Sequence, residues 1–453
     1  MLSIVLAAGK GTRMRSDLTK VLHPLAGKPM VGHVIDTLKE IKDNKIICVV
    51  GHQADEVRQT LDTGLVFVEQ KKQLGTGHAV IQAREYLARY EGPVLIVCGD
   101  TPLLRKETLR KLLSRHRKEN SDLSILTAIL EEPGSYGRIV LDDEKKNIKR
   151  IVEITDASPK EREIKEVNSG LYCFRGKLLN QALDSLDRDN AQGEYYLTDV
   201  VDYLAGQGKK ICPVRINDPA EIKGVNTRKD LAEAENEIRQ RINNSHMLNG
   251  VTIIDPTSTF IDKEVEIGRD TIIYPFTYIE GNVSIGSHCK IGPQSRIVDS
   301  CLGEEVCLKS GCIIRESVIG SQCTIGPYAY VRPGCRIEEN VKLGDFVELK
   351  KARVETGAKV PHLSYVGDAE IGNGTNIGAG TIFANYDGKE KHKTVIGKSV
   401  FIGSNTTLIA PVKVGDRAKT GAGSVVTRDV LRDTTVLGVP ARVYKRRADE
   451  NNV

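Results

Sequence analysis

The chain has 453 residues, 40% of them hydrophobic, and its 65 lysines and arginines against 60 aspartates and glutamates give a net charge of +5. This length is typical of two domains, and the small charge excess without a long basic run argues against a nucleic-acid-binding protein. The chain begins with a core-like strand instead of a signal peptide, and it has no apolar run of about 18 residues, so we expect a cytoplasmic protein without a membrane partner.

The first element is an apolar strand followed by a glycine-rich, cationic loop. Residues 2–14 read LSIVLAAGKGTRM, with Gly9, Lys10, Gly11 and Arg13 directly after the strand. Glycines let backbone N–H groups approach an anion, and cations neutralise it. The spacing fits neither the dinucleotide fingerprint nor the Walker A loop. The loop therefore predicts a different kind of nucleotide site, or else an ordinary glycine turn with solvated cations.

Short apolar strands alternate with amphipathic helices up to about residue 228. We expect strands at 2–8, 45–51, 65–70 and 93–100 and helices at 30–43 and 106–120. This alternation predicts a mostly parallel, doubly wound α/β sheet, in which ligands bind beyond the carboxyl ends of the strands. Gly9, Arg13 and Asp100 all stand at such ends.

A helix is expected at 229–249. After Gly250 a dipeptide of Ile, Leu or Val followed by Gly recurs, often six residues apart, as from Gly286 to Gly292. Such a hexapeptide repeat predicts a parallel β-helix whose aliphatic residues point inward. We expect its interruptions at 293–319, 345–371 and 379–396 to be inserted loops, which often lie on a binding face.

The ten cysteines have scattered spacings and no CxxC pair. This pattern indicates reduced thiols and argues against a zinc site. Those of the second half are expected to be small apolar core residues: Cys289, Cys301, Cys307, Cys312, Cys323 and Cys335.

Several longer motifs point to one family. They include LAAGKGTRM, QLGTGHA at 73–79, CGDTPLL at 98–104, EVNSGLYCF at 166–174, HLSYVGDAEIG and NIGAGTIFANYDG. Over nearly the whole chain they resemble the bacterial bifunctional N-acetylglucosamine-1-phosphate uridyltransferases/glucosamine-1-phosphate N-acetyltransferases. The resemblance implies a uridyltransferase domain at 1–228, a linker helix at 229–249 and a left-handed β-helix acetyltransferase domain at 250–453.

For the first domain the resemblance implies that UTP and N-acetylglucosamine 1-phosphate react with Mg²⁺ present. Arg13 and Lys20 would neutralise the triphosphate, and Asp100 and Asn226 would bind the metal. The remaining nucleotide- and sugar-binding residues would be Leu6, Ala7, Ala8, Gly9, Gln70, Gly75, Thr76, Cys98, Gly99, Gly137, Glu153 and Asn168. Taken singly, Glu153 is more typical of a surface carboxylate and Asn226 of a helix cap.

For the second domain the resemblance implies acetyl transfer from acetyl-CoA to glucosamine 1-phosphate. An ammonium is not a nucleophile, so a base must remove a proton, and histidine has a suitable pKa. The family pattern points to His362, oriented by Glu348. The other residues would be Arg332 and Lys350 on the phosphate, Tyr365 and Asn376 on the sugar, and Ala379, Asn385, Tyr386, Ser404 and Ala422 on acetyl-CoA, with Lys391 near the same ligands.

One position departs from the family pattern. Val439 stands where the family usually has an arginine that contacts CoA, and Arg442, Lys445, Arg446 and Arg447 are candidates to replace it. The resemblance also implies a homotrimer that supplies a precursor of peptidoglycan and lipopolysaccharide. Two alternatives stay open: another sugar-1-phosphate nucleotidyltransferase with a regulatory β-helix, and a non-catalytic subunit.

Overall fold

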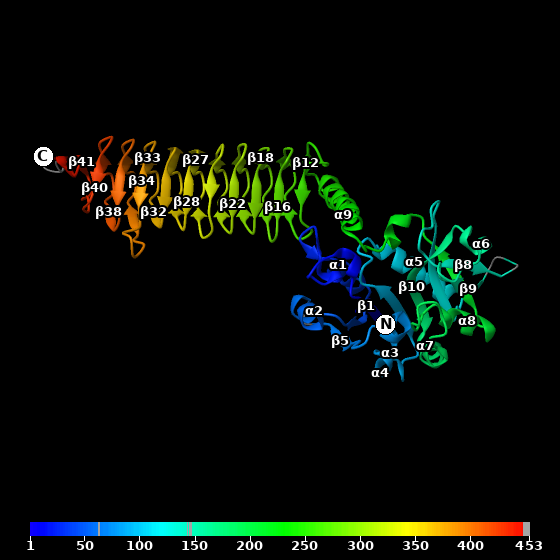
Figure 1. Cartoon of the computed structure of the whole chain (residues 1–453). Helices are drawn as coiled ribbons and strands as arrows, with labels where there is room; N and C mark the ends of the chain where they lie inside the picture. The colour runs from blue at the N-terminus through cyan, green and yellow to red at the C-terminus, as the bar shows by residue number, and fades with distance from the viewer. Residues whose placement is uncertain (62–63, 143, 145–146, 447–453) are drawn as a thin grey trace. The chain divides into compact units, whose positions relative to one another are not determined.

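The computed structural model describes residues 1–61, 64–142, 144 and 147–446. The chain divides into two compact units, Met1–Ile238 and Arg239–Val453, and the division falls within helix α9 (Arg228–Leu248; Figure 1). Among the described residues, no helix combines the length and apolar character needed to cross a membrane.

The N-terminal unit is built on a twisted sheet with the strand order β11-β7-β10-β6-β1-β4-β5. Strand β10 runs antiparallel to β6 and β7, whereas the other pairs on this path are parallel. The strands are β1 (Leu2–Ala7), β4 (Lys45–Val50), β5 (Val66–Glu69), β6 (Pro93–Cys98), β7 (Leu123–Ile129), β10 (Glu166–Arg175) and β11 (Ile211–Arg215), with β8 (Arg138–Leu141) and β9 (Ile148–Val152) as an antiparallel extension beside β10. The predicted doubly wound α/β fold is confirmed, including all four strands expected from the apolar runs.

Helices cover the sheet because its strands bury side chains on both faces. In β1, Leu2 and Ile4 join one apolar cluster, while Val5 and Ala7 join another. The helices of this unit are α1 (Met30–Lys39), α2 (Ala54–Thr60), α3 (Thr76–Ile81), α4 (Arg84–Leu87), α5 (Lys106–Lys118), α6 (Pro159–Arg162), α7 (Gly176–Ala182) and α8 (Asp199–Gly206). This packing fixes the carboxyl ends of β1 and β6, where Ala7 and Cys98 lead into the candidate site.

The C-terminal unit is a left-handed parallel β-helix, as predicted. Its short strands stack into three faces that run from β12 (Thr252–Ile253), β13 (Phe260–Ile261) and β14 (Glu266–Ile267). The second residue of a typical strand points inward, as does the residue two positions before it. One continuous apolar core results, and the antiparallel pair β41 (Thr434–Gly438) and β42 (Ala441–Arg446) follows the last coil.

Two of the three predicted inserted loops are wrong. Ile273 pairs with Ile291, and Ile291 pairs with Leu308, so a coil can shorten by one residue without losing its strands. The interruptions at 293–319 and 345–371 are shortened coils of this kind, since Arg296 pairs with Ile313 and Glu348 with Tyr365. Only in 379–396 does the described chain insert a loop, because Ile377 pairs with Ile402, a much longer step along the chain.

The cysteine prediction is partly wrong, because the alternation of inward and outward positions decides which cysteines are buried. Cys289, Cys312, Cys323 and Cys335 are buried at inward positions. Cys301 is exposed and Cys307 is half-buried, because each precedes an inward leucine and therefore points outward.

Candidate active sites

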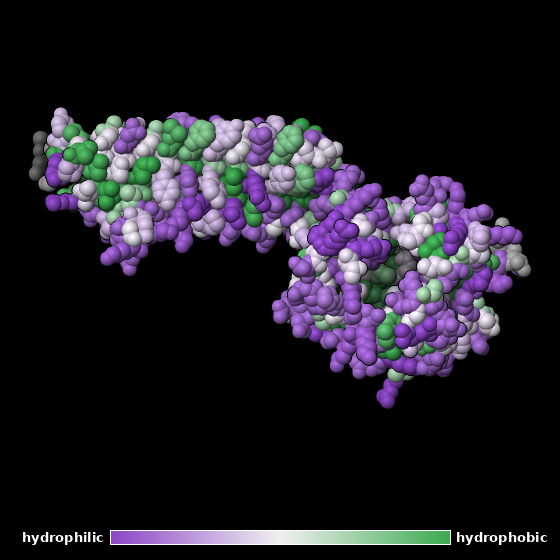
Figure 2. All heavy atoms as spheres, in the orientation of Figure 1, coloured by the Kyte–Doolittle hydropathy of each residue, from purple (hydrophilic) through white to green (hydrophobic). Residues whose placement is uncertain are grey.

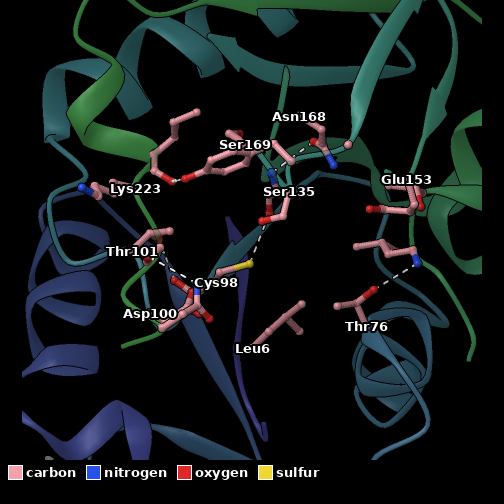
Figure 3. A pocket seen from close by; sticks show the side chains of 18 of the residues that line it. Leu6, Thr76, Cys98, Asp100, Thr101, Ser135, Glu153, Asn168, Ser169 and Lys223 are labelled. Atoms are coloured by element: carbon pink, nitrogen blue, oxygen red, sulfur yellow. Dashed lines mark hydrogen bonds between the residues drawn. The ribbon is translucent and has the colours of Figure 1, made fainter. Parts of the chain in front are cut away.

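Two adjoining cavities open at the carboxyl ends of β1 and β6. The first, of about 550 Å³, is lined by the glycine-rich loop, Lys20, Gln70 and Gly75. The second, of about 450 Å³, is lined by Arg13, Gly137, Glu153, Asn168 and Asn226. Leu6, Thr76, Cys98 and Asp100 line both cavities (Figure 3). Two ligands bound side by side would therefore meet at Asp100. The surface of the N-terminal unit is mostly hydrophilic, with a hollow that has hydrophobic residues inside it (Figure 2).

The glycine-rich loop passes unusually close to Lys20. Gly11 has a φ of +62°, and a Cβ atom built there would lie 2.5 Å from the Cβ of Lys20. The N–H of Met14 donates to the carbonyl oxygen of Gly11 at 2.9 Å, which closes the turn that carries Arg13. Glycine at this position therefore allows Arg13 and Lys20 to serve one site.

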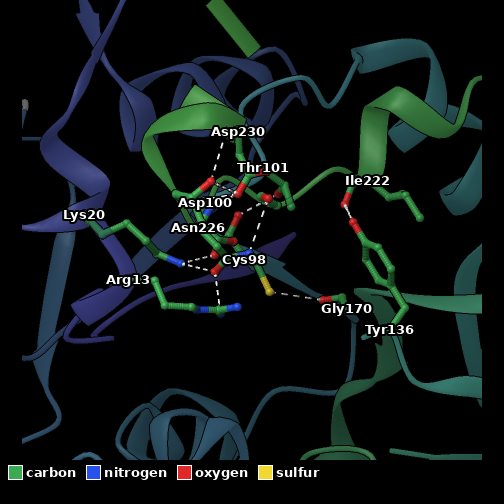
Figure 4. Close-up of polar contacts among 12 residues, drawn as sticks. Arg13, Lys20, Cys98, Asp100, Thr101, Tyr136, Gly170, Ile222, Asn226 and Asp230 are labelled. Carbon is green, nitrogen blue, oxygen red and sulfur yellow. Dashed lines mark hydrogen bonds and ion pairs between the residues drawn. The ribbon is translucent and has the colours of Figure 1, made fainter. Parts of the chain in front are cut away.

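A polar cluster joins the two cavities (Figure 4). The Lys20 ammonium donates to Asp100 Oδ2 and, at 3.1 Å, to Asn226 Oδ1, while Arg13 Nη2 donates to the same amide oxygen at 2.9 Å. The side chains of Lys20 and Asp100 are 13% and 22% exposed. A carboxylate oxygen and an amide oxygen thus share one ammonium, so they lie close enough to share a small cation. Oxygen donors of this kind are those that Mg²⁺ prefers, and the pair fits that metal.

Asn226 is not a helix cap. The Asp230 carboxylate accepts the N–H groups of Thr227 at 2.8 Å and of Asn226 at 3.1 Å, and the Asp230 N–H donates to Thr227 Oγ1 at 3.1 Å. Thr227 and Asp230 therefore cap α9 between them. The amide oxygen of Asn226 is left to the polar cluster.

The second cavity has a carboxylate in its wall. Thr198 Oγ1 donates to Glu153 Oε1 at 3.2 Å, and burial raises the pKa of Glu153 above its usual value. Gly137 lies beside this carboxylate, because a Cβ atom there would lie 3.5 Å from Glu153 Oε2, in ordinary van der Waals contact. Asn168 is buried, and its Nδ2 donates to Tyr172 Oη at 2.7 Å. Glu153 is therefore a cavity residue and not an isolated surface carboxylate.

Cys98 and Gly99 occupy different surroundings although they are neighbours in sequence. Burial raises the pKa of the Cys98 thiol to about 12, and its Sγ donates to the carbonyl oxygen of Gly170 at 3.8 Å. Cys98 is thus a neutral part of the wall. Gly99 lies outside both cavity linings, and its N–H donates to the carbonyl oxygen of Leu6 at 2.9 Å.

In the first cavity, the wall that contains the predicted nucleotide-binding residues Gln70 and Gly75 is held together by hydrogen bonds. Gln70 is buried, and its Nε2 donates to the carbonyl oxygen of Gly75 at 3.0 Å and contacts His78 Nδ1 at 3.0 Å. Gly75 has a φ of +104°, and a Cβ atom there would lie 2.6 Å from the carbonyl oxygen of Tyr195. Sequence reasoning missed further lining residues, which lie in loops without a periodic pattern: Gln73, Ser135 and Lys223.

In the C-terminal unit, four predicted residues form a column at one corner of the β-helix. Gly380 N–H donates to the carbonyl oxygen of His362 at 3.2 Å, Asn405 N–H to that of Ala379 at 2.7 Å, and Gly423 N–H to that of Ser404 at 2.8 Å. Successive coils therefore place His362, Ala379, Ser404 and Ala422 one above another.

A second group of predicted residues lies on the face that follows this corner. Lys350 Nζ donates to Asp368 Oδ2 at 3.4 Å, and Asn385 Nδ2 donates to the same oxygen. The ammonium of Lys350 lowers the pKa of Lys391, which stands in the inserted loop. Two adjacent ammonium groups are an arrangement that an anion would stabilise. Tyr365 on β31 (Tyr365–Gly367) pairs with Glu348 on β28 (Glu348–Lys350). Asn376 lies instead on β33 (Asn376–Ile377), on the face of β30 that precedes the corner.

The predicted pairing of Glu348 with His362 is wrong in this structure. Glu348 Oε1 accepts instead from Arg332 Nη1 at 2.8 Å. The carboxylate hydrogen-bonded to His362 Nδ1 is that of Asp345, which sequence reasoning missed. The two predicted residues lie on different faces, because the corner of the coil at 363–364 separates His362 from the strand that pairs with β28.

The remaining predicted residues lie near the tip of the unit or in its loop. Tyr386 is 59% exposed, and its hydroxyl donates to the carbonyl oxygen of Gly388 at 2.7 Å. Val439 is 73% exposed between β41 and β42, and Arg442 and Lys445 are exposed on β42. The side chain of Arg446 and the whole of Arg447 lie outside the described residues.

Comparison with known families and structures agrees with this two-part organisation. The MobA-like NTP transferase domain matches residues 3–157, the GMPPB C-terminal domain matches residues 248–335, and six bacterial transferase hexapeptide repeats match residues 393–428. A solved UDP-glucose pyrophosphorylase complexed with UDP-glucose is 18% identical, with a TM-score of 0.44 over 53% of this chain and 98% of that one.

Full-length relatives are much more similar. Three proteins named "Bifunctional protein GlmU" match nearly end to end. The one from Listeria monocytogenes serotype 4a is 48% identical over 95% of this chain and 94% of its own. That from Syntrophomonas wolfei is 50% identical over 94% and 95%, and that from Brevibacillus brevis is 49% identical over 98% and 96%. With its nucleotidyltransferase fold and its hexapeptide β-helix, this chain belongs to the GlmU family of bifunctional proteins.

Proposed function

We propose that this chain is an enzyme that makes UDP-N-acetylglucosamine in two steps. Residues 250–453 transfer the acetyl group of acetyl-CoA to glucosamine 1-phosphate, and residues 1–228 then transfer the uridyl group of UTP to the product. The observation that carries the proposal is the cluster of Arg13, Lys20, Asp100 and Asn226 at the junction of two cavities. The cluster supplies cations for the triphosphate, Arg13 and Lys20, and oxygen ligands for a metal ion, Asp100 and Asn226.

In the uridyl step, a phosphate oxygen of N-acetylglucosamine 1-phosphate attacks the α-phosphorus of UTP. The new P–O bond forms as the bond to pyrophosphate breaks, and pyrophosphate leaves. Arg13 and Lys20 bind the triphosphate, and Glu153 and Asn168 orient the sugar in the second cavity. Asp100 and Asn226 would hold Mg²⁺, which when bound neutralises phosphate charge. The chemistry requires alignment and charge neutralisation more than covalent help.

In the acetyl step, the amine nitrogen of glucosamine 1-phosphate attacks the thioester carbonyl. A C–N bond forms, the C–S bond breaks, and His362 passes the amine proton to the leaving thiolate. Arg332, Lys350 and Lys391 neutralise the sugar phosphate, which fits the two adjacent ammonium groups. Acetyl-CoA lies along the corner column, where Ser404 donates to the carbonyl oxygen as charge develops on it.

The active form is proposed to be a homotrimer. An exposed ridge along the same corner supports this assembly: Tyr328 and Phe346 stack with ring centroids 5.4 Å apart, and Phe346 and Leu363 are 57% and 60% exposed. Exposed apolar patches of this kind mark interaction sites, and three copies can pack around one axis. Light scattering tests the assembly, and a fully active monomer would contradict it.

Mass spectrometry of the products tests the whole function. Glucosamine 1-phosphate, acetyl-CoA, UTP and Mg²⁺ together should give UDP-N-acetylglucosamine, CoA and pyrophosphate. A nucleotide sugar formed only from another sugar 1-phosphate, without acetylation, would favour the alternative nucleotidyltransferase. No product from any of these substrates would favour a non-catalytic protein.

A further inference from the structure

The side chain that meets His362 is Asp345. Asp345 ends β27 (Lys342–Asp345) and His362 ends β30 (Lys359–His362), and the two residues are direct partners on these neighbouring parallel strands. Asp345 Oδ1 is hydrogen-bonded to His362 Nδ1. An ionised carboxylate can only accept, so Nδ1 carries the hydrogen and Nε2 is free to take a proton.

The backbone around this pair is built for close approach. A Cβ atom on Gly344 would lie 1.4 Å from the carbonyl oxygen of Pro361, so only glycine lets the two strands come this close. Leu363 N–H donates to the carbonyl oxygen of Asp345 at 3.0 Å, and Ser364 Oγ donates to that of His362 at 2.8 Å. The residues before and after the pair therefore fix both backbones.

We propose that Asp345 is the positioning residue of the acetyl-transfer base, holding His362 in the tautomer whose Nε2 accepts the amine proton. This inference rests on the acetyl transfer proposed above. As the C–N bond forms and the C–S bond breaks, the proton moves from the amine to Nε2 and then to the leaving thiolate. The Asp345 carboxylate stabilises the imidazolium that exists between these two transfers.

The charges near the pair favour an ionised Asp345. The hydrogen bond from His362 holds the pKa of Asp345 below its usual range, and the Lys309 ammonium acts in the same direction. Glu348, the other carboxylate considered for this role, is bonded to Arg332 at 2.8 Å. Asp345 is therefore the carboxylate that contacts His362, whereas Glu348 is held by Arg332.

The test compares Asp345→Asn with three other variants of the full-length enzyme. Asp345→Asn should lower kcat of acetyl transfer by about 10- to 100-fold, by analogy with the carboxylates that orient metal-binding histidines, with little change in KM. The lower-pH limb of its kcat/KM profile should move to lower pH, because the charge that favours the imidazolium is gone. Asp345→Glu should restore part of kcat.

Asp270→Asn is the matched control, because Asp270 and His288 form a similar exposed pair, 4.0 Å apart, elsewhere on the β-helix. It should leave acetyl transfer unchanged. An unchanged kcat and pH profile in Asp345→Asn, or the same pH displacement in Glu348→Gln instead, would overturn the assignment. A loss confined to KM would make Asp345 a substrate-binding residue and would also overturn it. Failure of the wild-type enzyme to acetylate glucosamine 1-phosphate would instead refute the proposed function.

Discussion

Asp100→Asn is the substitution that tests the nucleotidyl site most directly. Asparagine keeps the size and one oxygen of the side chain but removes its charge, at the position where the two cavities meet. Lys20 keeps its 3.1 Å bond to Asn226, so the fold of the site should survive. The change therefore separates charge from shape.

The expected size of the effect follows from burial. Two unit charges about 4 Å apart interact by about 4 kcal/mol at an effective dielectric constant near 20. The Asp100 side chain is 22% exposed, which reduces this only modestly. We take about 3 kcal/mol for the lost attraction to the metal–triphosphate complex, which corresponds to a roughly 100-fold loss in kcat/KM.

The assay is pyrophosphate release from UTP and N-acetylglucosamine 1-phosphate over a range of Mg²⁺ concentrations. Acetyl transfer by the same preparation serves as the folding control and should be unchanged. Asp55→Asn is the matched charge control, because Asp55 is 88% exposed and pairs with Arg58 at 2.9 Å away from the cavities. Near-normal pyrophosphate release by Asp100→Asn at low Mg²⁺ would refute the metal-ligand reasoning.

Three further predictions address other parts of the chain. His362→Ala should lower acetyl transfer by about 10²- to 10⁴-fold, mainly in kcat, and leave uridyl transfer unchanged, whereas equal loss of both activities would mean a structural role. Burial and neighbouring carboxylates, first Asp202, raise the pKa of Asp199 to about 6, so Asp199→Asn should raise the free energy of unfolding by about 1–2 kcal/mol at pH 8. This gain in stability should fade as the pH falls from 6 towards 4, and a pH-independent difference in urea denaturation would contradict the reasoning. Gly344→Ala should abolish acetyl transfer because its Cβ would collide with Pro361. In the control Gly357→Ala the new Cβ meets nothing within 4 Å, so this variant should lose only about 1 kcal/mol of stability in urea denaturation. An active Gly344→Ala enzyme would show that acetyl transfer does not require the close approach of these two strands.

The sequence predicted features that a local pattern determines. Apolar runs located β1, β4, β5 and β6, and the recurring aliphatic–glycine dipeptides predicted the β-helix. Cys301 shows where this reasoning failed: the alternation of inward and outward positions decides its exposure, and residue type alone does not reveal the phase.

Contacts between coils were beyond the sequence pattern. Asp345 meets His362 because the coil between them is a shortened one, and a coil longer by one residue would shift the partner by one position. The aliphatic–glycine spacing lapses in that coil, so the sequence suggested a loop where strands continue. The polar cluster at Asp100 was predicted by family resemblance alone, since Asn226 is distant in sequence and its position before a helix favoured a role as a helix cap.

The stacking of coils also determines how the acetyltransferase unit should melt. Each coil is hydrogen-bonded mainly to the coil before it and the coil after it. The stability of one coil therefore depends on its direct neighbours, and unfolding can begin at one end and proceed coil by coil. The corner column from His362 to Ala422 occupies the last coils before the terminal pair β41 and β42. Fraying from that end reaches the acetyl-transfer residues first, while the coils that begin at β12 are still intact. On gradual heating, acetyl transfer should therefore be lost before most of the β-helix signal in circular dichroism disappears.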